Sequence, residues 1–149
     1  MTAWWRGQQG TTTLELALML PFVIVLLLGS LDLARAMNAV LVVSSASREG
    51  ARYAVLHPTA APSQIVDAVI ARSVPLDPAL IAVAATYDDG MGPTPWPDTG
   101  LPRSAEVARA IPVRVDVTYP WSAATFFTGS ILGRSGIPLA SSSRMEARW

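Results

Sequence analysis

Between Leu16 and Leu31 the chain runs for sixteen residues without a charge, LALMLPFVIVLLLGSL. Extended back through Thr11–Leu14, the run reaches about the 20 residues that a helix needs to cross the hydrocarbon core of a bilayer. A helix that is apolar on every side is too hydrophobic for the surface of a soluble domain. We therefore expect this run to form a helix that stays in a membrane as an anchor.

Two alternatives for the run stay open. One is a buried helix of a soluble protein, and the other is a cleaved secretory signal with Ala34-Arg35-Ala36 as its small-x-small cleavage site. Asp32, which separates the run from that site, and the length of the run both disfavour a signal peptide. Since Arg6 precedes the run, the positive-inside rule favours an N-terminus in the cytoplasm and an extracytoplasmic remainder.

Glu15 lies directly before this apolar run, where a carboxylate is unexpected. An acidic side chain costs about 2.5 to 3.5 kcal/mol near the centre of a membrane helix and less near the interface. Glu15 either reaches back to the lipid headgroups or awaits a positive partner in the plane of the membrane.

Pro21 stands inside the same run. A proline removes one helical hydrogen bond and crowds the carbonyl four residues earlier, here that of Ala17. Membrane helices tolerate this because neighbouring helices can compensate. The sequence therefore predicts a modest bend near Ala17 in a helix that favours partners.

Residues 32–57 contain no proline and continue the helical pattern, with one polar, solvent-exposed side and one side of small residues. A continuous helix from Thr13 to His57 would be about 67 Å long. Within it lies the element Arg48-Glu49-Gly50-Ala51-Arg52. Glycine inside a helix costs about 1 kcal/mol relative to alanine, so Gly50 suggests a close backbone contact or a bend. Glu49 is spaced to form a surface pair with Arg52 or with Tyr53.

The remainder predicts a small α+β head. A linker at 57–63 precedes a helix capped by Ser63, with an apolar stripe at Ile65, Val66, Val69 and Ile70. A strand is expected at 80–87, an exposed loop at 88–103 that holds Trp96 as a contact residue or an anchor, a strand at 110–119 ended by Pro120, and a last strand at 138–148. The fold class is thus a long N-terminal helix followed by a head with one short helix and a two- to four-stranded antiparallel sheet.

Several function classes find no support. The net charge is zero, which argues against nucleic-acid binding, and cysteine is absent, which excludes thiol catalysis and cysteine-ligated zinc. His57 is the single histidine and is expected to be structural or solvated. Asp88-Asp89-Gly90 lacks the alternating ligands of a calcium loop and predicts a turn. We expect no enzyme, no cofactor, no metal and no small-molecule substrate.

Gly10-x4-Glu15, placed between a short leader and the apolar run, looks like a prepilin processing pattern. Together with LELALMLPFVIVLLLGSLDLAR and the later SREGARYAV, it resembles the TadE-like pseudopilins of the tight adherence (Tad/Flp) pilus system, over residues 7–57. The resemblance implies that a prepilin peptidase cuts after Gly10, so that the new ammonium group of Thr11 lies one helical turn from Glu15.

On this resemblance, residues 1–10 are a leader, 11–57 a transmembrane and extended helix, and 58–149 a small extracytoplasmic domain. The implied function is that of a minor pseudopilin, packed through its N-terminal helix into a type IV-like pilus. The implied partners are the inner membrane, the prepilin peptidase, other pilus or pseudopilin subunits and the inner-membrane assembly platform. The alternative is an uncut single-pass scaffold of an envelope secretion complex.

Overall fold

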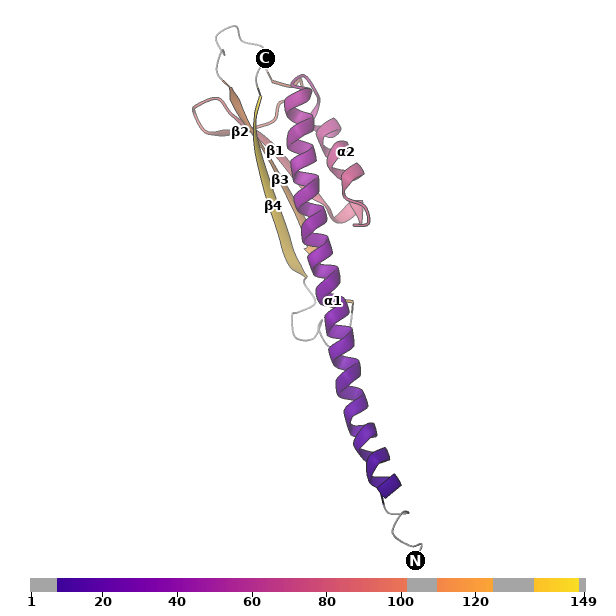
Figure 1. Ribbon diagram of the computed structural model, residues 1–149. Coiled ribbons are helices and arrows are strands. Elements are labelled where there is room, and N and C mark those ends of the chain that lie inside the picture. The colour runs from indigo at the N-terminus through magenta and orange to yellow at the C-terminus, as the bar shows by residue number, and fades with distance from the viewer. Residues whose placement is uncertain (1–7, 102–109, 125–135, 148–149) are drawn as a thin grey trace, which may run out of the picture.

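The computed structural model describes residues 8–101, 110–124 and 136–147. Its longest element is α1 (Gln8–Leu56), a single helix of 49 residues. The N-terminal half of α1 projects away from the head, and the C-terminal half packs on the sheet (Figure 1). One helix therefore serves both as the apolar N-terminal segment and as a main element of the head.

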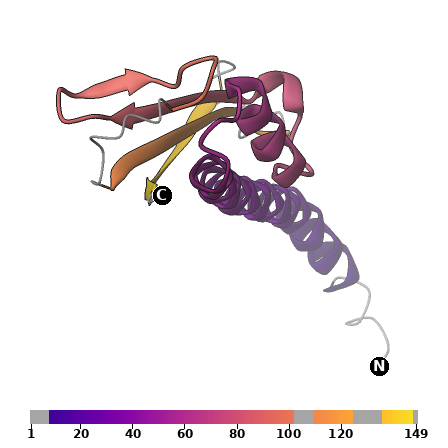
Figure 2. The ribbon, with the colours of Figure 1, turned by 90° about the horizontal axis from the view of Figure 1, so that it is seen from above.

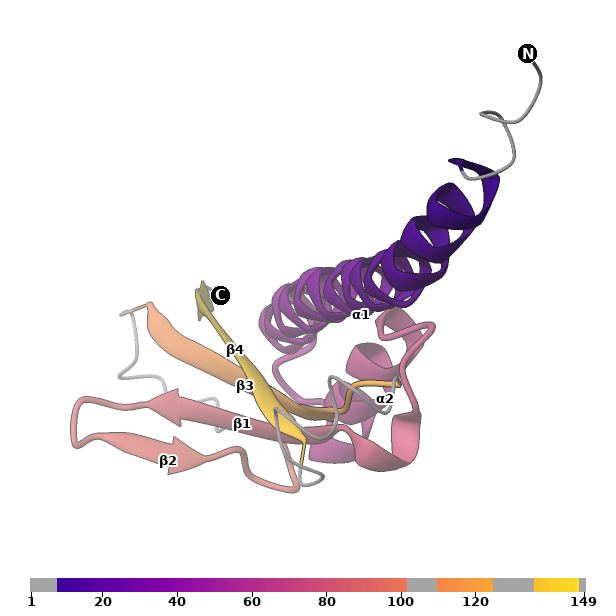
Figure 3. The same ribbon diagram turned by 90° about the horizontal axis from the view of Figure 1, so that it is seen from below.

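The sheet has four antiparallel strands in the order β2-β1-β3-β4. β1 (Ala82–Asp88) pairs with the short β2 (Pro93–Pro95), and the two long strands β3 (Ile111–Trp121) and β4 (Ile137–Ala147) pair along their whole length. The helices α1 and α2 (Pro62–Arg72) lie on one face of this sheet (Figures 2 and 3). The architecture is α+β, as predicted.

Buried and exposed side chains alternate along β3, and the buried ones show which face of the sheet lines the core. Val113, Val115 and Val117 are fully buried against the helices, whereas Arg114 lies exposed on the other face. This is the period of two expected for a strand with one buried face. Ile65 and Val69 of α2 are buried in the same core, as the predicted apolar stripe requires.

The helix α1 meets this core through small side chains. Ala46, Ala51 and Ala54 are fully buried, and so is Gly50. Because these residues carry little or no side chain, α1 can approach the sheet and α2 closely. The predicted side of small residues is thus the face that packs in the head.

Trp96 anchors its loop rather than projecting from it. Its side chain is 5% exposed, and its indole Nε1 donates a 2.9 Å hydrogen bond to the carbonyl oxygen of Ala60. Gly100, at φ +75°, lies directly against the backbone of Thr59, and the backbone N–H of Leu101 donates to the carbonyl oxygen of Pro58 at 2.6 Å. The segment 96–101 is therefore folded back onto the linker after α1.

Several predicted boundaries were wrong. The cap of α2 is Ala61 instead of Ser63, because Pro62 begins the helix and Gln64 Oε1 accepts from the backbone N–H of Ala61 at 3.1 Å. Pro120 does not end β3, since it pairs with Pro138 of β4 near the end of the ladder, where a missing donor costs little.

The first predicted strand begins later than expected, because Pro78–Leu80 forms a 3₁₀ turn with Asp77 Oδ1 accepting from the backbone N–H of Ala79. The expected exposed loop at 88–103 contains β2 and, at Trp96, Gly100 and Leu101, buried residues. The predicted core contributions of Phe126, Phe127 and Ile131 lie outside the described residues.

Candidate functional site

The segment Thr11–Leu27 of α1 is exposed at every position. Its most apolar 18-residue window has a mean hydropathy of 2.4 and no buried residue, so α1 is long and apolar enough to cross a membrane. Solvent-exposed leucine and phenylalanine in such number would be unfavourable in water. This half of the helix is consistent with a membrane anchor.

The residues of the predicted processing site lie in the first turns of this segment. α1 begins at Gln8, so Gly10 and Thr11 are already helical. Glu15 is exposed one turn beyond Thr11, as the i, i+4 spacing requires. Helix extends through the position of the expected cut.

Pro21 lies inside α1 without interrupting it. The helix is assigned as continuous from Gln8 to Leu56, and the side chain of Pro21 is exposed. The predicted bend near Ala17 stays a prediction, while the predicted continuity of the helix is confirmed.

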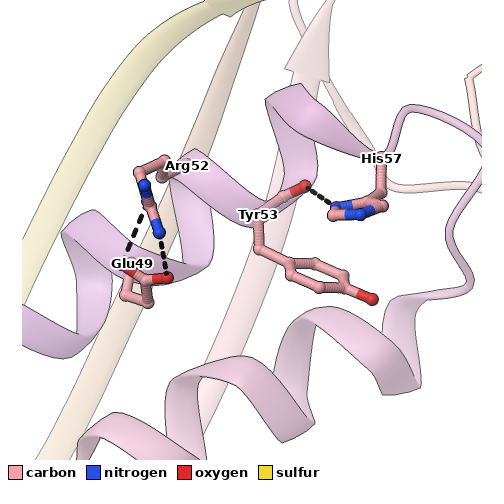
Figure 4. A network of polar contacts seen from close by, with 4 residues as sticks. All are labelled: Glu49, Arg52, Tyr53 and His57. Carbon is pink, nitrogen blue, oxygen red and sulfur yellow. Dashed lines mark hydrogen bonds and ion pairs between the residues drawn. The ribbon is translucent and has the colours of Figure 1, made fainter.

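The element at residues 48–52 divides between two sides of α1. Gly50 and Ala51 face the head and are buried, whereas Arg48, Glu49 and Arg52 lie on the outer side. Arg52 Nη2 and Nε lie 3.1 and 3.2 Å from the two carboxylate oxygens of Glu49, which confirms the expected pair (Figure 4). An exposed pair of this kind contributes about 0.5 kcal/mol or less.

Gly50 makes the close contact that its position in a helix suggested. A Cβ at this position would lie 2.5 Å from Val69 Cγ2 of α2 and 3.1 Å from Val115 Cγ1 of β3. At this glycine, α1 therefore contacts both α2 and the sheet closely. Its role is packing within the head.

His57 closes α1 next to Tyr53. The two rings stack with their centroids 4.3 Å apart, and His57 Nδ1 lies 3.2 Å from the backbone oxygen of Tyr53 (Figure 4). The histidine is exposed at the end of the helix. The stack orders the last turn of α1, in keeping with the expected structural role.

Asp32 has a role in the fold that the sequence analysis did not predict. It is 3% exposed although it follows directly on the apolar run. Its Oδ1 accepts a 3.2 Å hydrogen bond from the backbone N–H of Ala124, beyond the end of β3, and lies 4.0 Å from Arg35 Nη1. Asp32 thus ties the base of the head to α1 at the end of the apolar segment. The sequence feature that could have indicated this role is the position of an acidic residue between the apolar run and the half of the helix that packs in the head.

The described residues include two surface hollows lined by arginine side chains. One, of about 520 Å³, crosses the outer side of α1 and includes Arg48, Arg52 and Arg72. The other, of about 350 Å³, lies on the outer sheet face beside Tyr87 and Arg114. Within the described ranges, no group of histidine, aspartate and glutamate side chains could hold a metal ion.

The structure does not gather the predicted site residues into one place. Glu15 and Arg48 are on the same helix but about 50 Å apart at 1.5 Å per residue. The N-terminal residues belong to the exposed apolar segment, and residues 48–52 belong to the head. The arrangement suits an anchor joined to a rigid head better than a catalytic centre.

Comparison with known proteins gives one match. Residues 10–52 match the family model described as TadE-like protein. The matched range covers most of α1, from the predicted cleavage site to Arg52. No curated protein and no solved structure matches the chain.

Proposed function

We propose that this chain, which carries a TadE-like domain at residues 10–52, is a minor pseudopilin and structural assembly component of a tight adherence pilus. TadE-like proteins are generally non-enzymatic structural proteins. In this proposal α1 crosses the inner membrane with its N-terminus in the cytoplasm. The head is extracytoplasmic, and a prepilin peptidase trims the chain after Gly10.

One observation carries the proposal: the TadE-like match coincides with a helix that is free along one half and packed along the other. Residues 11–27 are exposed and hold a single charge, that of Glu15, while residues 43–54 are built into the head. A pilus subunit needs both parts, an apolar helix available to neighbours and a head that keeps its fold.

Exposed apolar side chains continue along α1 above the anchor. Leu33, Met37 and Leu41 are between 62% and 68% exposed. At 100° per residue, Leu33 and Met37 fall within about 40° of Glu15 around the helix axis. A neighbouring helix laid along this side would cover the exposed residues and Glu15 together, which supports packing through the N-terminal helix.

Trimming supplies a counter-charge for Glu15. A cut after Gly10 creates an ammonium group on Thr11, one turn from the carboxylate. In a membrane this pair, formed within the chain or with a neighbour, offsets part of the cost of the buried acid. The same carboxylate can then guide a subunit into place beside another.

The mature N-terminus decides the proposal. The full chain is expressed in a membrane with and without a prepilin peptidase, and its N-terminal peptide is read by mass spectrometry. We expect a chain that starts at Thr11 only when the peptidase is present. A chain that keeps residues 1–10 in the presence of an active peptidase contradicts the proposal.

An uncut scaffold of an envelope complex is the second candidate, and one observation favours it. α1 runs without a break from Gln8 through Gly10 into the apolar segment, so the expected cut lies inside a helix. The variant Glu15→Gln distinguishes the two functions. If the chain is a scaffold, its complex is recovered in unchanged amount; if it is a pseudopilin, the variant is still cut but assembles poorly.

A further inference from the structure

Three arginines surround the larger hollow on the outer side of α1. We call it the arginine hollow and define it by Arg48 and Arg52 of α1, Arg72 of α2, and the less polar Ala71 and Met145. It extends across the outer side of α1 from Met145 on β4 to α2, and its volume is about 520 Å³. The hollow is open to solvent and lies on the head, far from the anchor.

The arginine hollow carries uncompensated positive charge. Arg52 is paired with Glu49, but Arg48 donates to the neutral hydroxyl of Ser44 at 2.8 Å. Among the described residues Arg72 forms no ion pair. Two guanidinium groups are therefore available to a carboxylate, which they can bind through two parallel N–H donors.

The opposite charge is held by the turn between β1 and β2, which we call the acidic turn (Asp88–Gly92). Asp88 Oδ1 accepts from the backbone N–H groups of Gly90 and Gly92 at 2.9 and 3.3 Å, and Asp89 Oδ1 accepts from that of Met91 at 3.0 Å. Gly90 and Gly92 have φ values of +102° and +122°, which suits glycine. The turn is thus ordered by its own bonds before any contact forms.

Met91 adds an apolar side chain to the acidic turn. It is 96% exposed, so its whole side chain is accessible to a second molecule. Ala71 and Met145 provide apolar lining in the arginine hollow. The turn and the hollow therefore match in charge and in their apolar component.

The acidic turn and the arginine hollow lie on different sides of the head. The β1–β2 hairpin ends on one side, and α1 and α2 lie on the other (Figures 1 and 2). A contact between them must therefore join two molecules head to tail. Such a heterologous contact leaves a free turn and a free hollow at the two ends, so it can repeat into an open chain.

We propose that the acidic turn of one copy of this chain docks into the arginine hollow of a second copy. Asp88 and Asp89 face Arg48 and Arg72 across the contact, and Met91 enters the hollow. The contact rests on the proposed function, because it adds a bond between the extracytoplasmic domains of subunits whose N-terminal helices share one membrane.

Disulfide crosslinking tests the contact in the full membrane-inserted chain, which contains no cysteine of its own. Met91→Cys and Ala71→Cys are co-expressed and oxidised, and we expect a covalent dimer, since two cysteines join only when their Cα atoms come within about 7 Å. A chain carrying both substitutions should give a ladder of higher multimers. The matched control pairs Met91→Cys with Ala140→Cys, an exposed alanine of β4 that lines neither hollow, and should lose the dimer.

Charge reversal gives a second measurement on the same crosslink. Asp89→Arg alone, or Arg48→Glu with Arg72→Glu, should each lower the yield about fivefold per reversed pair, the effect of an exposed ion pair. Mixing the two variants should restore part of the yield, because the arginine introduced at position 89 then faces the glutamates introduced at positions 48 and 72. If the crosslinking yield stays the same in these charge-reversal variants, the proposal is overturned.

Equal dimer yields from the Ala71 and Ala140 pairs also overturn it. The mature N-terminus is read by mass spectrometry in the same samples. A trimmed chain without the specific crosslink overturns the docking contact and leaves the pseudopilin function standing, whereas an untrimmed chain overturns that function.

Discussion

Gly50 of α1 lies so close to Val69 of α2 that a Cβ at position 50 would lie 2.5 Å from Val69 Cγ2. Valine is stiff about χ1 and cannot swing aside. We expect Gly50→Ala to lower the free energy of unfolding by about 1 to 2 kcal/mol, since overpacking outweighs the better helix propensity of alanine. Thermal unfolding of the detergent-solubilised chain, followed by circular dichroism, measures the change.

A matched control for Gly50→Ala is Gly29→Ala, because no atom lies within 4 Å of the added Cβ at position 29. This variant should melt no lower than the parent. Adding Val69→Ala to Gly50→Ala should return part of the lost stability, since it removes the methyl group that clashes. An unchanged midpoint for Gly50→Ala would contradict the close contact.

Asp32 and Ala124 form the next testable contact. Asp32→Ala leaves the backbone N–H of Ala124 without this acceptor, at an expected cost of about 1 to 3 kcal/mol. Asp32→Asn keeps an oxygen in place and should cost less. Hydrogen exchange read by mass spectrometry should show faster exchange at residues 122–124 in Asp32→Ala than in Asp32→Asn. Equal protection in both variants and the parent would show that the carboxylate does not hold this segment.

Trp96 and Ala60 give a third test. Trp96→Phe removes the indole N–H and leaves the buried carbonyl oxygen of Ala60 short of a donor, so we expect a loss of about 1 to 3 kcal/mol. The loss should appear as earlier proteolytic cleavage within 96–101, because this segment is held against the linker by that bond. Asp98→Ala, an exposed change in the same segment, serves as the control. Cleavage at the parental rate in Trp96→Phe would contradict the anchor role.

The sequence predicted the elements whose pattern is local. The long helix was predicted from Thr13 to His57, because Pro21 is the one proline in that stretch, and the structure has it at Gln8–Leu56. β3 followed from its alternating valines. The close contact at Gly50 was also expected, because a glycine in a helix interior is costly without a reason.

The sequence did not predict what depends on distant residues. β2 was missed because Pro93-Thr94-Pro95 reads as a loop, and prolines are accepted there only because β2 is an edge strand. The burial of Asp32 depends on Ala124, which lies 92 positions away. The arginine hollow combines residues of α1, α2 and β4, whose proximity no local pattern shows.

Met37 tests whether the exposed side of α1 above the anchor packs against another helix. Its side chain is 62% exposed, so Met37→Asp should leave the fold and the melting temperature of the isolated chain unchanged. In a neighbour's contact, however, the new carboxylate would be buried without a partner. Since such burial costs about 1 to 3 kcal/mol or more, the chain should fall about tenfold in the pilus fraction sheared from cells with the complete assembly system.

The control for Met37→Asp introduces the same charge next to it. Asn38 is also exposed but is turned by 100° around the helix axis, so Asn38→Asp should enter the sheared fraction at the parental level. The comparison holds net charge and helix position nearly constant and changes only the side of α1 that carries the acid. If both variants enter the fraction equally, the exposed side of α1 at Leu33 and Met37 is not a packing surface, and the anchor must meet its neighbours through another side.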